Sequence, residues 1–271
     1  MGYPVPNSLS PSRVDAFTTC PLQFRFASIE KLPEPPGAAA TKGSMVHRAL
    51  ELLFCLSATE RTAQNAHRCL AEAVAEYLVD PEFAMLELDE DAVATFVADA
   101  GTLVGNYLTM EDPTAVHEIG LELRLEAPVG DLSLRGIIDR LELDSDGGLI
   151  VTDYKTGRPP MRDREQGKLG GLNFYAFLCQ AVLGRRPAKV RLMYLRTGET
   201  IEATPSEQSV TFLTKRTTAV WNAVERACSS GDFRPRPSGL CNHCAFQAYC
   251  PSFGGNPDLA ASELGKAMVA A

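Results

Sequence analysis

The most informative part of the chain is residues 131–155, DLSLRGIIDRLELDSDGGLIVTDYK. Two runs rich in Leu, Ile and Val flank the sequence DSDGG at 144–148, a pattern typical of neighbouring antiparallel strands joined by a tight turn. We therefore predict strands over 131–143 and 148–155. This pair is expected at the centre of a β-sheet.

Two aspartates of this pair are predicted to face each other. If Leu143 lies opposite Leu149, counting four residues along each strand pairs Asp139 with Asp153. Like charges at opposed positions destabilise a sheet unless a cation lies between them. Lys155 follows Asp153 by two residues and so shares its face. A slip of one strand by one residue separates the acids, but in this register the three side chains predict a hydrolytic metal site.

A structural interpretation of the same residues competes with the catalytic one. Asp139 can pair with Arg135 or Arg140, and Asp-x-Lys is a common tripeptide. What favours catalysis is the opposed acid together with Gly157 and the basic residues that follow it. These basic residues are Arg158, Arg162, Arg164 and Lys168. They are expected to hold a phosphate backbone without sequence preference.

The chain on both sides of this pair alternates between helical and strand patterns. Helices are predicted from Ser10, over 42–57, 62–79, 89–109, 168–183 and 206–229, and further strands over 116–127, 188–197 and 199–204. Strands interspersed with helices predict a mixed sheet with helices packed on it, the α/β class. The two acidic helices in the middle are interpreted as an inserted helical lobe.

A single histidine lies in a suggestive context. His47 lies near the start of a predicted helix that follows Gly43, and Glu51 comes four residues later, so the side chains of His47 and Glu51 share one helix face. Gly43 permits close backbone approach, which would let His47 reach a sheet edge. A lone helical histidine is more often structural, and that alternative stays open. His67 and His117 have no motif around them.

Three cysteines form a C-x2-C-x5-C motif at Cys241, Cys244 and Cys250. Thiolate sites of this kind need a fourth ligand. Cys20 is the best candidate, since a proline follows it as one follows Cys250, and Cys-Pro occurs at iron–sulfur ligands. Zinc sites usually take their ligands from two close pairs, whereas three of these cysteines are close together and the fourth is distant in the sequence. This spacing favours an iron–sulfur centre over zinc, for which His243 is a further possible ligand. The other cysteines are expected to be core thiols: Cys55, Cys69, Cys179 and Cys228.

Composition narrows the class of protein. The chain has 271 residues, is 45% hydrophobic and carries a formal charge of −8. The charge argues against a protein that coats duplex DNA, although residues 151–200 are locally basic and predict a charged groove. The sequence has no phosphate-loop motif, no membrane-length apolar run and no signal-peptide pattern. We expect a cytoplasmic protein, without membrane contact, whose thiols are reduced.

Together these residues resemble the PD-(D/E)xK nuclease superfamily. The resemblance is to its RecB-family exonucleases with an iron–sulfur cluster, whose relatives include the CRISPR-associated adaptation nucleases and AddB-type nuclease domains. It rests on Ser10 to Pro21, Gly43 to His47, Gly136 to Arg140, Val151 to Gly157 and Cys241 to Pro251. It implies a restriction-endonuclease-like mixed central sheet flanked by helices. It also implies a metal-dependent DNA exonuclease, acting on single-stranded DNA in repair or recombination, with a helicase or repair protein as partner.

The resemblance also assigns roles to residues. It implies that His47, Asp139 and Asp153 bind Mg²⁺ or Mn²⁺ with the backbone carbonyl of Tyr154, and that Lys155 is the catalytic lysine. The implied ligands of a [4Fe-4S] cluster are Cys20, Cys241, Cys244 and Cys250.

One family element departs from its usual form. The family often has Gln-x3-Tyr on the helix after the lysine strand, whereas Gly171 stands four residues before Tyr175 and Gln166 is out of register. How this helix contacts DNA is therefore in question, and Tyr175 is retained as a possible DNA-binding residue.

The expected organisation is one nuclease domain over 1–255. Within it we place a helical insertion at about 60–112 and a cluster-binding segment at 234–253, followed by a flexible tail at 256–271. The rival interpretation is a catalytically silent iron–sulfur or zinc module that binds DNA or a partner on a nuclease fold. Intact Asp139, Asp153 and Lys155 favour the enzyme.

Overall fold

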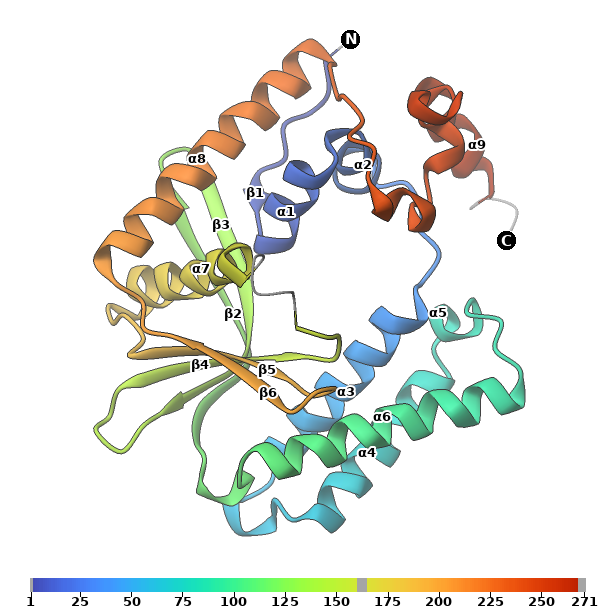
Figure 1. Ribbon diagram of the computed structural model, residues 1–271. Helices are drawn as coiled ribbons and strands as arrows, with labels where there is room; N and C mark the ends of the chain where they lie inside the picture. Colours follow the sequence, from blue (N-terminus) through green and yellow to red (C-terminus); the bar gives the residue numbers. More distant parts are fainter. Residues whose placement is uncertain (1, 160–164, 268–271) are drawn as a thin grey trace. The chain divides into compact units, whose positions relative to one another are not determined.

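The computed structural model describes residues 2–159 and 165–267, with side chains over 2–159 and 173–264 (Figure 1). The helices are α1 Pro11–Thr19, α2 Pro21–Phe24, α3 Ala38–Phe54, α4 Ala63–Leu78, α5 Pro81–Ala84, α6 Glu90–Met110, α7 Glu165–Leu183, α8 Glu207–Ser230 and α9 Ala260–Ala267. The strands are β1 Ser8–Leu9, β2 His117–Val129, β3 Leu132–Leu143, β4 Leu149–Lys155, β5 Lys189–Tyr194 and β6 Glu199–Ala203.

The strands form a mixed sheet in the order β1-β3-β4-β5-β6, with β2 also paired to β3. Strand β3 is antiparallel to β4 and β5 is antiparallel to β6, whereas β4–β5 and β1–β3 are parallel. The predicted α/β class, with a mixed central sheet flanked by helices, is confirmed. Helix α7 makes the crossover that a parallel β4–β5 pair requires.

The predicted register of the central hairpin is confirmed. Leu143 pairs with Leu149, and the pairing continues to Arg140 and Thr152. The turn between the strands is held by Asp144, whose Oδ1 accepts hydrogen bonds from the amides of Asp146 and Gly148. Such side-chain-to-backbone bonds are the reason why Asp favours turns.

By backbone proximity the chain divides into two compact units. Unit 1 comprises Met1–Pro35, Glu126–Arg135 and Thr211–Ala271, and unit 2 comprises Pro36–Leu125 and Gly136–Val210. The domain limits of the sequence analysis stay a prediction.

The core of unit 2 is built where α3, α4 and α6 pack together with Tyr154, Met193 and Leu195 of the sheet strands and the turn after β5. Apolar residues recur along α3 on one stripe, which is the pattern that buries one face of a helix. Asp89 caps α6 by accepting a hydrogen bond from the amide of Ala92. The helical lobe therefore shares one core with the strands of this unit.

Unit 1 holds the two ends of the described chain. Ser10 caps α1 as predicted, by accepting a hydrogen bond from the amide of Arg13. The buried Arg25 forms ion pairs with Glu30 and, at 3.7 Å, with Asp258. The predicted tail contains α9, an alanine-containing segment with high helix propensity. Within the described ranges, no helix has the length and apolar character to cross a bilayer.

Candidate active site

The site begins where β3 and β4 leave their paired register. One position beyond the Arg140–Thr152 pair lie Asp139 and Asp153. The Asp139 carboxylate accepts a 2.7 Å hydrogen bond from the backbone amide of Tyr154. Asp153 is 3% exposed and is thus among the few buried acids of the described chain. The hairpin therefore brings both predicted acids to one place.

Asp153 is engaged by two neighbours. Its Oδ2 forms an ion pair with the ammonium of Lys155, two residues along the same strand. Its Oδ1 accepts a 3.1 Å hydrogen bond from the hydroxyl of Tyr175 on α7. Tyr175, retained from the sequence as a possible DNA contact, is thus placed against an acid of the site. Asp153 and Tyr175 together connect α7 to β4.

His47 reaches the same place from α3. Its Nε2 lies 3.0 Å from the backbone carbonyl oxygen of Tyr154, and its Nδ1 lies 3.5 Å from Asp139 Oδ2. A Cβ at Gly43 would meet the hydroxyl of Thr156 at 3.1 Å, so a side chain there would press on the residue after Lys155. The close approach expected of Gly43 is confirmed.

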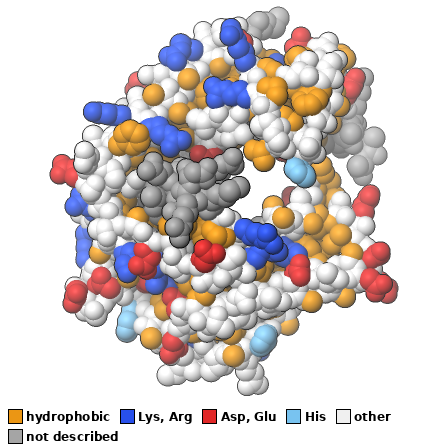
Figure 2. All heavy atoms as spheres, in the orientation of Figure 1, with side chains coloured by type: hydrophobic (Ala, Val, Ile, Leu, Met, Phe, Trp, Pro, Cys, Tyr) orange, Lys and Arg blue, Asp and Glu red, His pale blue; other side chains and the backbone are white. Residues whose placement is uncertain are grey.

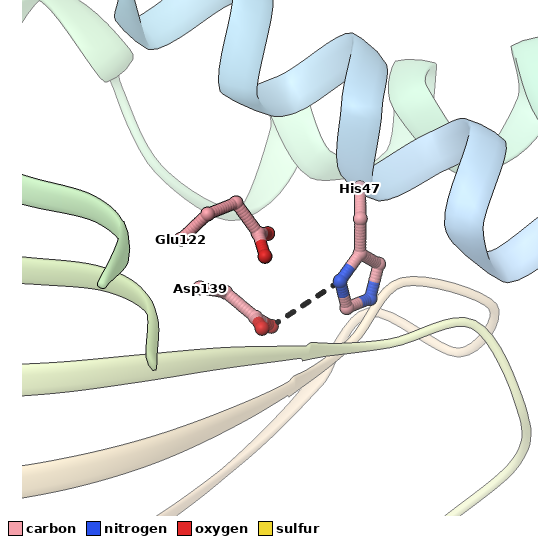
Figure 3. A group of neighbouring side chains, drawn as sticks. All are labelled: His47, Glu122 and Asp139. Atoms are coloured by element: carbon pink, nitrogen blue, oxygen red, sulfur yellow. Dashed lines mark ion pairs between the residues drawn. The ribbon is translucent and has the colours of Figure 1, made fainter. Parts of the chain in front are cut away.

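A third acid was missed by the sequence analysis. Ligand atoms of His47, Glu122 and Asp139 all lie within 4.8 Å of one another, and Figure 3 shows their side chains converging from α3, β2 and β3. Glu122 has a φ of +44°, in the left-handed region that a non-glycine residue rarely adopts. Its strand carries acids at 118, 122 and 126, and nothing in the sequence distinguishes the middle one.

Burial and repulsion from nearby acids disfavour the charged forms of the two acids in this group. Burial, and then the nearby Asp153, raises the pKa of Asp139 to about 8. Burial and Asp139 also raise the pKa of the Glu122 carboxyl. Burial lowers the pKa of His47, so its imidazole is neutral and keeps a lone pair at neutral pH. Although burial opposes its charge, Lys155 has a raised pKa because Asp153 is adjacent.

These donors fit a divalent metal. Carboxylate and carbonyl oxygens suit Mg²⁺ and Mn²⁺, and an imidazole makes Mn²⁺ at least equally suitable. The group formed by His47, Glu122 and Asp139 is compact enough to share one ion. Asp153 stands beside this group, with its oxygens turned to Lys155 and Tyr175.

The four predicted cluster cysteines line one cavity in unit 1 (Cys20, Cys241, Cys244 and Cys250). Cys20 ends α1, and the other three lie on short 3₁₀ turns or the links between them. Burial, and to a smaller extent the three neighbouring thiols, raises the pKa of Cys244. The fold of unit 1 therefore brings Cys20 to the same cavity as the three C-terminal cysteines, although they are far apart in the sequence.

No three of these thiols gather as closely as the ligands of a bound zinc ion do. A tetrahedral zinc with bonds of about 2.3 Å holds its sulfurs about 3.8 Å apart. Across the part of the chain whose side chains are described, no three cysteine or histidine ligand atoms at this cavity lie within 4.8 Å of one another. Of the remaining cysteines, Cys69, Cys179 and Cys228 are buried as expected, but Cys55 is exposed because it follows the last turn of α3.

Comparison with known proteins places the chain in a family. Residues 8–251 match the profile of the PD-(D/E)XK nuclease superfamily. The chain belongs to this superfamily. Its members generally use divalent metals, which agrees with the donors gathered around Asp139.

The proteins that are similar to this PD-(D/E)XK chain match different shares of its length. The Gene 69 protein of Mycobacterium phage D29 is 23% identical over 270 residues, covering 90% of this chain and 96% of that protein. An ATP-dependent helicase/nuclease subunit of Pelotomaculum thermopropionicum is 29% identical over 165 residues, which cover 58% of this chain but 13% of that protein. The solved structure of a candidate exonuclease from Eubacterium rectale has a TM-score of 0.54 at 11% identity, covering 88% of this chain and 87% of that one. This last likeness supports the restriction-endonuclease-like fold.

The residues predicted to contact DNA are only partly described in this PD-(D/E)XK chain. Arg158 is exposed just after β4. Arg162 and Arg164 lie outside the described residues, and Lys168 belongs to α7 with its side chain outside them. On the face seen in Figure 2, Lys and Arg side chains are interspersed with Asp and Glu side chains.

Proposed function

We propose that this chain is a Mg²⁺- or Mn²⁺-dependent DNA exonuclease of the RecB type, which hydrolyses phosphodiester bonds of single-stranded DNA in repair or recombination. The observation that carries the proposal is the convergence of His47, Glu122 and Asp139 beside the Asp153–Lys155 ion pair. A metal-ligand group next to a buried acid and an ammonium is what phosphodiester hydrolysis needs.

The residues that would hold the metal are His47, Asp139 and Glu122, with Asp153 and the carbonyl oxygen of Tyr154 completing the set. When bound, a divalent ion supplies a water of lowered pKa and a positive charge against the phosphate. Tyr154 orients Asp139 by donating its amide hydrogen to the carboxylate. The neutral imidazole of His47 is ready to act as a ligand because burial keeps its pKa low.

Lys155 would act directly on the reacting phosphate. Asp153 keeps its ammonium charged and oriented through their ion pair. A positioned cation at a phosphate oxygen stabilises the charge that develops in the transition state. Tyr175 fixes Asp153 from the other side by its hydroxyl, so it acts on the acid and through it on the lysine. Arg158, with Arg162, Arg164 and Lys168, would hold the DNA backbone.

We also propose that Cys20, Cys241, Cys244 and Cys250 bind a [4Fe-4S] cluster. The support is their common cavity and the Cys-Pro sequence at Cys20 and Cys250, which is typical of iron–sulfur ligands. The amide of Ser238 donates a 3.3 Å hydrogen bond to the Cys241 sulfur, a contact that stabilises a thiolate ligand.

A helicase is proposed as the partner. The support is the likeness to a segment of the helicase/nuclease protein of Pelotomaculum, of which this chain spans 13%. The name of that protein joins the two activities. Co-purification of this chain with a helicase encoded by the same genome would test the proposal, and a helicase-free chain in every such preparation would contradict it.

The test of the nuclease is an assay on matched linear and circular single-stranded DNA of the same sequence, with Mn²⁺, with Mg²⁺ and with EDTA. We expect the linear substrate to be shortened from its ends with either metal, and the circle to survive. Equal cleavage of the circle would contradict an exonuclease. Metal-dependent binding without cleavage of either substrate would instead support the silent binding module.

A further inference from the structure

A buried network of charged residues lies on the opposite face of β3 and β4 from Asp153 and Lys155. Arg140 is 0% exposed and Glu142 is 4% exposed. Arg140 pairs with Glu111 through both guanidinium ends, at 3.0 Å for the Nη2 contact, and with Glu142 at 2.5 Å. Arg191 on β5 forms an ion pair with Glu142 as well. Two arginines and two glutamates therefore neutralise one another within unit 2.

Such a network is a poor source of stability in itself. Desolvating charges is expensive, and well-packed apolar residues often replace a buried ion pair without loss. Its value lies instead in the geometry that it imposes on its neighbours. The relevant neighbour is Tyr154, which lies between the network and the candidate metal ligands.

The side chain of Tyr154 belongs to the network. Arg140 donates a 2.8 Å hydrogen bond to the Tyr154 hydroxyl. The ring of Tyr154 is 3% exposed and meets the rings of Tyr107 and His47 edge to face, with centroids 5.7 and 5.9 Å away. Tyr107 in turn donates its hydroxyl hydrogen to Glu111.

The backbone of the same residue belongs to the candidate site. The Tyr154 amide donates to Asp139 at 2.7 Å, and its carbonyl oxygen lies 3.0 Å from His47 Nε2. Two of the three grouped metal-ligand side chains are thus oriented by the backbone of one residue, whose side chain is held by Arg140.

We infer that Arg140 is a positioning residue, which acts through the Tyr154 hydroxyl to fix the backbone that orients His47 and Asp139 for the metal. Glu111 supports it from the end of α6, so the helical lobe takes part in shaping the site. This inference rests on the proposed function, because it assigns the residues that preorganise the same metal site.

The decisive variant is Tyr154→Phe, which deletes one hydroxyl and keeps the ring and the backbone. Arg140 retains Glu111 and Glu142, so the fold is expected to survive. Loss of an outer-shell partner weakens metal binding by about 10-fold or more. We expect that weakening in the Mn²⁺ dissociation constant, measured by titration calorimetry, with an unchanged circular dichroism spectrum.

A second variant, Glu111→Gln, tests the direction of the coupling. It loosens Arg140 without touching Tyr154 directly, and we expect a weakening of Mn²⁺ binding by about 3-fold or more. If both changes act through the same hydrogen bond, the double variant is weakened less than the product of the two single effects. Fully multiplicative effects would contradict the pathway through Tyr154.

The matched control is Glu118→Gln. Glu118 pairs with the buried Arg61, which donates to the carbonyl groups of Pro113 and Val116 rather than to Tyr154. This variant is expected to lose stability but to bind Mn²⁺ within about 2-fold of the wild type. Wild-type Mn²⁺ affinity in folded Tyr154→Phe, or equal weakening in the control, would overturn the inference. A wild type that neither binds Mn²⁺ nor cleaves DNA would overturn the proposed function instead.

Discussion

The two candidate metal sites of the molecule are built in opposite ways. In unit 2 the donors are oxygens and an imidazole, drawn from α3, β2, β3 and β4, and three of them already gather within 4.8 Å. In unit 1 the donors are four sulfurs that line one cavity, three of them from one short segment. Oxygen donors suit hard divalent ions such as Mg²⁺ and Mn²⁺, whereas thiolates suit softer metal centres.

The difference lies in what supports each site. Around Asp139, burial and then repulsion between the acids raise the pKa values of the carboxyls, and the surrounding hydrogen bonds and ion pairs hold the geometry. Around the cysteines, a sequence motif and short 3₁₀ turns place three of the thiols, and the fold of unit 1 adds Cys20 from the end of α1. Removing a side chain should therefore affect catalysis in unit 2 and folding in unit 1.

The largest expected effect is on turnover. Lys155→Ala should lower the rate of DNA cleavage by about 10³-fold, since it removes the charge that faces the developing phosphate charge. Asp153→Ala should do the same, because the lysine loses its partner. Both variants should keep the melting temperature within a few degrees and any bound iron. Mn²⁺-dependent cleavage at the wild-type rate in both purified variants would reject the site.

The second-largest expected effect is on iron content and stability, when a ligand of the proposed cluster is removed. Cys244→Ser should lose its iron and its visible absorbance and lower the melting temperature by about 5 °C or more, because ligand binding contributes to folding. Cys55→Ser is the matched control, since Cys55 is exposed and lies in unit 2. If anaerobically prepared wild type is folded, colourless and free of iron, the proposal that unit 1 binds a cluster is wrong.

The pH dependence of the oxygen-rich site has a defined sign. The pKa of Asp139 rises from 3.8 to about 8 on folding. Without metal, the folded state then binds more protons between these values, so stability falls as pH rises towards 8. Metal must displace this proton, so Mn²⁺ affinity should rise about tenfold per pH unit up to about pH 8. Calorimetric titrations at about pH 6, 7 and 8 measure the slope, and a flat profile would contradict it.

A smaller effect, on Mn²⁺ affinity, should distinguish Glu122 from the other acids on its strand. Glu122→Gln should weaken Mn²⁺ binding by about tenfold, because it removes one charged donor from the group. Glu126→Gln, on the same strand and exposed, should leave binding unchanged. Equal Mn²⁺ affinities of the two variants would show that Glu122 is not a ligand.

The smallest expected effect concerns DNA backbone contact. Arg158→Ala should reduce affinity for all single-stranded sequences alike and lower the slope of log affinity against log salt by about 1. Binding measured by fluorescence anisotropy at several salt concentrations gives this slope. An unchanged slope would place Arg158 outside the DNA path.

Much of the fold followed from local patterns. The predicted strands and helices agree with the observed ones to within a few residues, because alternation, capping at Ser10 and the turn at Asp144 are properties of neighbouring residues. The confirmed register of β3 and β4 came from matching Leu143 to Leu149 across that turn. Such features are encoded within a few positions of one another.

Only part of the candidate site could be predicted from such local patterns. Asp139, Asp153 and Lys155 were named because their spacing along the strands predicted a shared face, and the family resemblance added His47 as a ligand. Glu122 and the orientation of Tyr175 towards Asp153 were not, since no local spacing distinguishes them. Their positions depend on how β2 and α7 pack against β3 and β4.

By itself, then, the amino-acid sequence determined the elements, the central hairpin and the chemical character of both sets of donors. Only the tertiary structure decided which acid joins His47 and Asp139, and that Arg140 lies buried against Tyr154. The physical reason is the distance over which each effect acts. Sequence patterns reflect interactions within one helical turn or one strand pair, whereas burial and charge repulsion depend on every element that packs against the site.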